Sequence, residues 1–357
     1  MVATEPQRTL REQLLAGQVI PAHPLALTPT RTIDERSQRA LTRYYCAAGA
    51  GGVAVGVHTT GFAIHDEVVG LYRPVLELAA ETIDAALESA PRPFARVAGV
   101  IGDTRQAVRE ATIARELRYD CVLVSLGAWR DADDAAIIAH CRAVGEVLPL
   151  FGFYLQPAVG GRRLERRFWR EFAELPSVVA IKIAPFDRYA TLDVVRAVAD
   201  AGRDDIALYT GNDDAIIADL VTPVPCLSGG RMIDRMLVGG LLGQWAVWTH
   251  TAVEWLDRIR AWRDAPSEPI PREWLAYGAA LTQANAAIFD AAHEYAGCLP
   301  GILEVLRTQG LVRGCWTLDP HERLAEGQAG AIARIVREFP GLTDDSFVAM
   351  HRDEWLA

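Results

Sequence analysis

The stretch Val178-Val-Ala-Ile-Lys-Ile-Ala184 decides the fold. It is apolar apart from one lysine and rich in β-branched residues, which is typical of a strand covered on both faces, as in parallel sheets. Similar runs occur at residues 19–27, 52–57, 95–101, 121–126, 148–155, 206–210 and 225–228. The chain is therefore expected to contain eight buried strands.

Segments of helical periodicity lie between these strands. They are expected at residues 33–48, 65–89, 103–118, 131–147, 163–175, 187–201 and 213–220. Thr32 is expected to cap the first of them, and Asp103 or Thr104 the third. Repeated strand–helix units are typical of α/β folds. Eight units, with no G-x-G-x-x-G after the first strand, favour a (β/α)8 TIM barrel over an open doubly wound sheet.

Strands cease after about residue 245, and helices are expected at residues 244–262, 272–292, 301–309 and 325–337. The predicted organisation is an N-terminal polar segment (1–18), a barrel carrying the active site (19–245) and a C-terminal helical extension (246–357). We expect the extension to pack against the barrel and to build an oligomer interface.

Composition narrows the class of protein. The 357 residues carry a net charge of −10, which argues against binding nucleic acid or an anionic membrane through bulk charge. The six cysteines are scattered, without zinc-site spacing, as expected of buried reduced thiols. His58 and His65 have no matched carboxylate or third ligand, so no metal is expected. Residues 1–18 lack the apolar core of a signal peptide, and no apolar run reaches membrane-spanning length, so a cytoplasmic location is expected.

Lys182 is the only lysine among the 36 Lys and Arg residues. A chain that uses arginine wherever either cation serves is expected to keep a lysine where arginine cannot act. Lysine in an apolar strand is expected to lower its pKa from about 10.4, so that a free amine can attack a ketone and form an imine. The structural alternative is a lysine that snorkels to the barrel rim or forms an ion pair. Its uniqueness favours the catalytic interpretation.

Other polar residues follow the predicted strands. Tyr154 ends the fifth strand, where a phenol beside Lys182 is suited to proton transfer, although an aromatic at a strand end is also common for structural reasons. His58-Thr-Thr-Gly61 offers hydroxyls and backbone N–H groups to an anion. Two further loops, Tyr209-Thr-Gly-Asn-Asp213 and Ser228-Gly-Gly-Arg231, end strands seven and eight, and their glycines are also ordinary turn residues.

These strand-end residues, in this order, resemble the dihydrodipicolinate synthase and N-acetylneuraminate lyase family. His58-Thr-Thr-Gly61 resembles its G-T-T-G-E loop, Tyr154-Leu-Gln-Pro157 its Y-N-x-P segment and Ile181-Lys182 its I-K strand, while Thr210-Gly-Asn-Asp213 resembles its S-G-D-D loop. The likeness of Leu27-Thr-Pro29 to the family's first strand ending extends the resemblance over most of the barrel.

The resemblance implies an imine between Lys182 and pyruvate or a related 2-keto acid. It also implies a carboxylate held by Thr59 and Thr60, and proton transfer by Tyr154. No cofactor is implied, and the expected assembly is a homotetramer or homodimer. Gly61, His58, Gly211, Asn212, Gly230 and Arg231 complete the expected binding residues.

The departures from the family pattern are His58 and Phe62 around the threonines, and Ser125-Leu-Gly-Ala-Trp129 where the synthases carry a tyrosine. They predict a reshaped pocket and make lysine biosynthesis an unfavoured assignment. Phe62 and Trp129 suggest an altered region for a second substrate, and Arg231 a contact to a second anionic group.

Retro-aldol or aldol chemistry is the leading hypothesis for the reaction. Dehydration of a keto-deoxy sugar acid through the same imine is the second. A non-catalytic homologue that binds a keto acid or sugar acid is the alternative from another class.

Overall fold

The computed structural model describes residues 5–88, 90–265 and 268–357. Strand β6 (Val178–Ala184) has the predicted bounds, and all seven of its residues are buried. It pairs in parallel with β5 (Leu150–Leu155) on one side and with β7 (Ala207–Thr210) on the other. A strand buried on both faces needs a nearly unbroken apolar sequence. This is why the strand could be predicted from the sequence of residues 178–184.

Eight strands belong to one sheet, in the order β1-β10-β7-β6-β5-β4-β3-β2. A parallel bridge between Ala22, just after β1, and Ala54 of β2 joins the two ends of this order. The prediction of a (β/α)8 barrel is therefore confirmed. The remaining bounds are β1 (Val19–Pro21), β2 (Gly52–Val55), β3 (Ala95–Val100), β4 (Cys121–Val124) and β10 (Gly239–Leu242).

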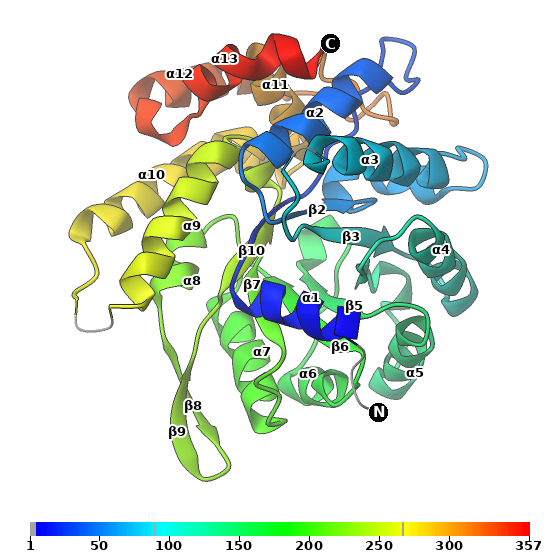
Figure 1. Cartoon of the computed structure of the whole chain (residues 1–357), viewed down its shortest axis with the longest axis vertical. Helices are drawn as coiled ribbons and strands as arrows, with labels where there is room; N and C mark the ends of the chain where they lie inside the picture. Colours follow the sequence, from blue (N-terminus) through cyan, green and yellow to red (C-terminus); the bar gives the residue numbers. More distant parts are fainter. Residues whose placement is uncertain (1–4, 89, 266–267) are drawn as a thin grey trace. The chain divides into compact units, whose positions relative to one another are not determined.

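The predicted eighth barrel strand is wrong. Residues 225–228 lie in β8 (Val224–Ser228), which pairs antiparallel with β9 (Arg231–Arg235) in a separate two-stranded sheet. Figure 1 shows these two strands as a hairpin apart from the barrel strands. The eighth barrel position is taken by β10, which pairs with β7. A short apolar run indicates a strand but does not indicate which strand it pairs with. The Gly-rich sequence of β10 lacks the apolar pattern that predicts a strand.

Helices alternate with the barrel strands as predicted (Figure 1). They are α2 (Glu35–Ala47), α3 (Tyr72–Leu87), α4 (Thr104–Glu116), α5 (Asp134–Gly145), α6 (Arg166–Ala173), α7 (Arg188–Asp200) and α8 (Ile216–Val221). Asp34, not Thr32, caps α2 by accepting a hydrogen bond from the Ser37 N–H, and Asp103 caps α4. The expected helix from 65 to 89 begins only at Tyr72, after two short 3-10 turns, and Ser89 lies outside the described residues.

The N-terminal polar segment contains a helix that periodicity did not predict. Helix α1 (Glu5–Leu15) places Leu10 and Leu14 in the core and contacts β6 and β7. The Tyr209 hydroxyl of β7 donates to the Leu14 carbonyl at 2.8 Å. This segment is therefore part of the barrel's packing.

In the described part of the chain, the α-helices after the barrel strands are α9 (Thr249–Arg263), α10 (Arg272–Ile288), α11 (Cys298–Thr308), α12 (Gln328–Glu338) and α13 (Asp345–Trp355). The last, missed from sequence, packs against α2, where the Tyr44 hydroxyl donates to Asp344 at 2.6 Å. No helix in the described ranges is long and apolar enough to cross a membrane.

The chain divides into two compact units. The first comprises Met1–Gln18, Ala95–Asn212 and Ala218–Leu241, and the second comprises Val19–Phe94, Asp213–Ile217 and Leu242–Ala357. This grouping differs from the expected division into three consecutive segments, because β/α units distant in sequence pack together. The three-segment organisation stays a prediction. Each unit is described by itself below.

Candidate functional site

Lys182 lies in the carboxyl-terminal half of β6 and is only 7% exposed. Strand register places it opposite Phe153 of β5 and Tyr209 of β7. Residues paired across parallel strands project to the same face of the sheet. The Lys182 Nζ atom accordingly lies over the Phe153 ring, 4.5 Å from its centroid. The amine is thus held against an aromatic face inside the first unit.

Gly211, one of the predicted binding residues, packs against the stem of Lys182. A Cβ atom at position 211 would lie 2.8 Å from Lys182 Cε and 2.7 Å from Ala184 Cβ, closer than packed atoms tolerate. The N–H of Gly211 donates to the Ile183 carbonyl at 2.7 Å, which fixes the loop against β6. Glycine at this position therefore leaves space for the lysine side chain.

Asn212, which follows this glycine, is held by hydrogen bonds of its side chain. It is 3% exposed, and its carbonyl oxygen accepts from the Phe186 N–H at 3.0 Å. Its amide donates to the Thr191 hydroxyl at 3.1 Å and to Asp219 at 2.9 Å. Asp219 also accepts from the Thr210 hydroxyl at 2.6 Å. Asn212 is thus engaged at both ends of its amide, and it positions the loop that carries Gly211.

The structure does not bring the Tyr154 hydroxyl to Lys182. Tyr154 is paired with Ile183, one residue beyond Lys182, so alternation directs it to the opposite face of the sheet. Its ring packs against Trp169 of α6 with centroids 5.2 Å apart. Its hydroxyl donates to the Leu164 carbonyl at 3.1 Å and accepts from the Leu164 N–H at 3.2 Å. Burial raises the pKa of Tyr154, and the hydrogen bond to Leu164 opposes that shift.

Tyr154 therefore packs between β5 and α6 as a structural residue. The residue that faces Lys182 from β5 is its neighbour Phe153, which sequence reasoning missed. The proton-transfer role of Tyr154 stays a prediction that this geometry does not support.

Gly230 and Arg231 lie in the β8–β9 hairpin and not at the end of a barrel strand, and their role in binding stays a prediction. Gly229 and Gly230 form the turn of the β8–β9 hairpin with φ values of 54° and 77°, in the region that favours glycine. Arg231 starts β9 and is exposed. Because Ser228–Arg231 ends no barrel strand, its residues do not belong to the carboxyl-terminal edge where Lys182 lies.

The threonine loop belongs to the second unit, and Thr60 is used internally there. Its hydroxyl donates to the His23 carbonyl at 2.7 Å and accepts from the N–H groups of Gly56 and Val57 at 3.0 and 3.3 Å. One donor and two acceptor positions are all that a hydroxyl has. The Thr60 hydroxyl is therefore fully used within the protein, and the carboxylate-binding role that the family resemblance implied stays a prediction.

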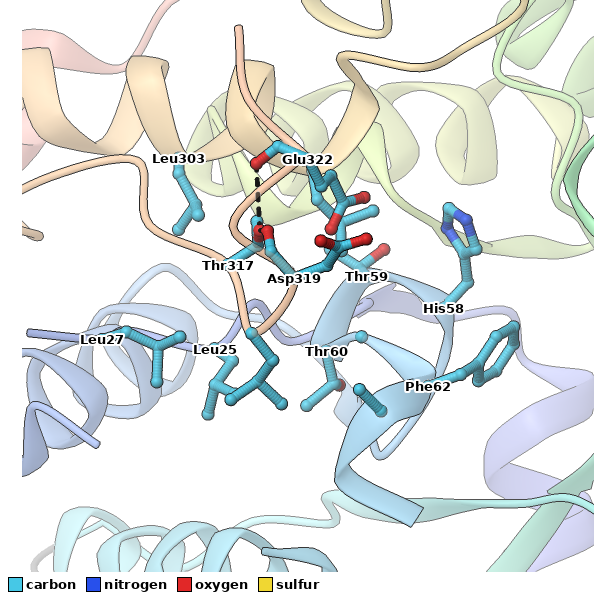
Figure 2. Close-up of a pocket in the computed structure, with 14 residues that line it drawn as sticks. Leu25, Leu27, His58, Thr59, Thr60, Phe62, Leu303, Thr317, Asp319 and Glu322 are labelled. Atoms are coloured by element: carbon cyan, nitrogen blue, oxygen red, sulfur yellow. Dashed lines mark hydrogen bonds between the residues drawn. The ribbon is translucent and has the colours of Figure 1, made fainter. Parts of the chain in front are cut away.

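His58, Thr59, Thr60 and Gly61 line one cavity of about 170 Å³, and Phe62 lines it as well (Figure 2). Its opposite wall comes from α11 and the segment after it. That wall carries Leu299, Leu303, Thr317, Asp319 and Glu322. Two carboxylates beside the loop oppose the binding of an anion. Sequence reasoning missed this wall because nothing local indicates that residues 317–322 lie against residues 58–62.

Trp129, the other residue that departs from the family pattern, makes contacts within the protein. Its indole N–H donates to the Gly102 carbonyl at 3.0 Å, and its ring lies 4.5 Å from that of His140. No group of three His, Cys, Asp or Glu side chains in the described part of the chain is arranged to hold a metal ion.

Comparison with known proteins finds relatives among the 4-hydroxy-tetrahydrodipicolinate synthases. No protein-family model matches the chain. A 4-hydroxy-tetrahydrodipicolinate synthase of Bifidobacterium longum (strain NCC 2705) is 30% identical over 202 residues, 55% of this chain and 60% of that protein. The enzyme of the same name from Clostridium perfringens (strain 13 / Type A) is 27% identical over 160 residues, 44% and 52% of the two chains. This chain spans about half the length of the curated relatives it matches.

Solved structures share the fold over nearly the whole chain. YagE, a prophage protein of the dihydrodipicolinic acid synthase family from E. coli K12 in complex with pyruvate, has a TM-score of 0.73 and 16% identity, covering 91% of this chain and 98% of that one. Dihydrodipicolinate synthase from Acinetobacter baumannii, complexed with pyruvate, has a TM-score of 0.71 and 16% identity, covering 90% and 98%. With the curated relatives and the shared barrel, the resemblance that the sequence shows to the dihydrodipicolinate synthase and N-acetylneuraminate lyase family is confirmed.

Proposed function

We propose that this protein is a lyase that forms an imine between Lys182 and a small 2-keto acid and then breaks or forms the adjacent carbon–carbon bond. The observation that carries the proposal is the placement of the chain's only lysine. Lys182 is buried in the carboxyl-terminal half of a barrel strand, where barrel active sites lie, with Gly211 leaving room for its side chain.

The chemistry uses the amine as a nucleophile. The uncharged amine of Lys182 attacks the keto carbon, and the carbinolamine loses water to give an iminium. In the retro-aldol direction the C4 hydroxyl loses its proton and becomes the aldehyde carbonyl as the bond between C3 and C4 breaks. The electron pair of that bond forms the C2–C3 double bond of an enamine and neutralises the iminium nitrogen, and the proton lost at C4 is balanced by the one later added at C3. Protonation at C3 and hydrolysis by water then release the keto acid and restore the amine.

The apolar surroundings of Lys182 support this chemistry. The Phe153 ring beneath Nζ and the apolar β6 neighbours limit the access of water to the amine. A carbinolamine collapses to an imine by losing water, so a dry setting favours the covalent state. Two of the similar solved structures hold pyruvate, which supports a 2-keto acid as the ligand.

Borohydride trapping tests the proposal. The protein is incubated with a panel of 2-keto acids, including pyruvate, and reduced. Intact mass and peptide mapping then locate the adduct. Since Lys182 is the only lysine, the chain offers one side-chain amine, and the N-terminal amine is the one competitor.

The control variants are Lys182→Met and Lys182→Arg. An adduct on Lys182 that needs the keto acid and disappears in both variants supports the imine, and we expect turnover to fall by at least about 10³-fold in both. If the adduct forms equally in the variants, or if no keto acid yields one, Lys182 is not an imine-forming residue. In that case, specific binding of a keto acid or sugar acid by calorimetry would indicate the non-catalytic homologue.

A further inference from the structure

The β8–β9 hairpin packs one of its faces against α7 within the first unit (Figure 1). Cys226 is buried on that face, and the Ser228 hydroxyl donates to the Ala199 carbonyl of α7 at 3.0 Å. Because side chains alternate along a strand, Leu227 and Met232 project from the other face. They are direct partners across the hairpin and are 61% and 66% exposed. The hairpin therefore ends in an apolar pair that the first unit leaves exposed.

The outer edge of β9 offers main-chain groups to another strand. The two-glycine turn makes Ser228 and Arg231 a hydrogen-bonded pair. Such pairs alternate with non-hydrogen-bonded ones in an antiparallel ladder, so Met232 and Asp234 direct their N–H and C=O groups away from β8. No hydrogen bond reaches these groups from elsewhere in the described ranges. On the outer edge of β8, by contrast, Pro225 has no N–H to donate.

A groove of about 360 Å³ lies at the base of the hairpin, along this same edge of β9. It is formed within the first unit by the end of α1, by β7 with the residues before it, and by β9 with the residues after it. Its apolar lining includes Leu15, Ile206, Leu208, Ile233, Met236 and Val238. An engineered cavity of about 150 Å³ accommodates benzene, so this groove has room for more than one apolar side chain.

The hairpin tip and the groove carry opposite charges. Arg231 at the tip is exposed, and no acidic side chain of the described residues pairs with it. The groove is lined by the carboxylates of Asp204 and Asp234 and by one guanidinium, that of Arg235, which gives it a net negative charge. Asp204 lies 2.5 Å from Arg235, yet its side chain is 76% exposed, so its oxygens can accept from a second cation.

A two-fold axis would bring the tip and the groove together. Two β9 strands related by such an axis run antiparallel, so the tip of each hairpin lies beside the base of the other. With Ile233 opposite its own copy, the outward main-chain groups of Met232 meet those of the partner's Asp234. Arg231 then lies on the same face of the sheet as the partner's Asp204. Strand edge, apolar surface and charge thus agree on one arrangement.

We propose that the hairpin is a self-association surface for a second copy of this chain. The two copies pair their β9 edges, and the tip of each hairpin, with Met232 leading, lies in the groove of the other. This surface is independent of the proposed imine chemistry. It is also distinct from the C-terminal extension, where the sequence led us to expect an oligomer interface. Because the contact is one strand edge and one groove, we expect a weak interface with a Kd in the micromolar range.

Sedimentation equilibrium of the full chain over a range of concentrations, without any keto acid, tests the proposal. We expect Met232→Glu to raise the Kd of self-association at least about tenfold, because it places a carboxylate against an apolar groove with an acidic rim. Met232→Lys loses the same apolar side chain but carries the opposite charge, so we expect a smaller increase of about threefold. Met350→Glu on α13, where the methionine is 77% exposed, is the matched control and should leave the Kd unchanged.

Two further measurements locate the contact. Amide hydrogen exchange at Asp234 should slow as the wild-type concentration is raised, because its outward N–H becomes hydrogen-bonded, and should stay fast in Met232→Glu. Asp204→Asn is expected to raise the Kd about threefold to tenfold in the wild type. In an Arg231→Gln background its effect should be smaller, because the two side chains form one contact between the copies.

Two results would overturn the proposal. One is a chain that stays monomeric at every concentration, because the groove would then have another occupant or none. The other is self-association with the same Kd in the wild type and in Met232→Glu, which would place the interface elsewhere. The Tm of each variant reports whether it folds. If Met232→Glu does not fold, Leu227→Glu, on the same exposed face, repeats the test.

Discussion

Lys182 and Phe153 are partners across two parallel barrel strands, and the lysine nitrogen lies 4.5 Å from the centre of the phenyl ring. The pairing makes Phe153, and not Tyr154, the β5 residue on the lysine's face of the sheet. It also means that one residue of register separates a tyrosine beside the amine from a tyrosine packed against a helix.

We expect Gly211→Ala to impair imine formation. The new Cβ would come within 2.8 Å of Lys182 Cε and 2.7 Å of Ala184 Cβ, so the lysine stem must move. Overpacking of this kind costs about 1 to 3 kcal/mol of stability. Borohydride trapping and denaturant unfolding measure the two effects. Gly330→Ala on α12, where a Cβ meets open space, is the control: it should leave trapping unchanged and should not lower stability. If Gly211→Ala gives the same yield of borohydride-trapped adduct as the wild type, Lys182 does not need the space that Gly211 leaves beside its side chain.

Tyr154→Phe is expected to lower stability more than activity. The hydroxyl pairs with the buried backbone of Leu164, and its loss leaves both backbone groups without that partner, at a cost of about 1 to 3 kcal/mol. A proton-transfer role would instead predict a loss of turnover of about 10² to 10⁴-fold. Urea unfolding and steady-state kinetics on the same preparation separate the two outcomes. A large fall in kcat with unaltered stability would restore the role that the family resemblance implied.

Arg231→Ala is expected to leave the KM for the keto acid within about twofold of the wild type, as for a surface position without special contacts. Arg231 is exposed at the start of β9, next to the hairpin turn. Saturation curves for the two proteins provide the test. A marked increase in KM would mean that the hairpin approaches the bound substrate.

Stability should depend on pH through His23. Burial lowers the pKa of His23 from 6.5 to about 4, while its ring nitrogens lie 2.8 Å from the Thr42 hydroxyl and the Pro24 carbonyl. Between pH 6.5 and 4 the unfolded chain therefore binds more protons at this residue than the folded chain does. The free energy of unfolding should fall as the pH is lowered across this window, by up to about 1.4 kcal/mol per pH unit from His23.

Denaturant unfolding between pH 7.5 and 4 measures this slope, and His23→Gln, which cannot titrate, should reduce it. His321→Gln on the surface is the control. Equal slopes in the wild type and His23→Gln would exclude His23 as the titrating group.

The barrel could be predicted from the sequence because parallel strands that are buried on both faces have nearly unbroken apolar sequences. Strand β6 is the clearest case. The hairpin glycines were placed at a strand end and the Gly-rich β10 was missed, because neither carries such an apolar run. Turn glycines look alike in any loop, and a strand of small residues has no apolar signature. Lys182 was recognisable as the candidate nucleophile because it is the only lysine, a property of composition alone.

By itself, the sequence determined the alternation of strands and helices and the identity of the unique amine, since both depend on local pattern and residue type. Tertiary structure alone decided that Phe153 rather than Tyr154 faces that amine, and that Asp319 and Glu322 lie across a cavity from Thr59. The reason is physical: strand register and long-range packing are set by the combined burial of many side chains, and no single segment carries that information.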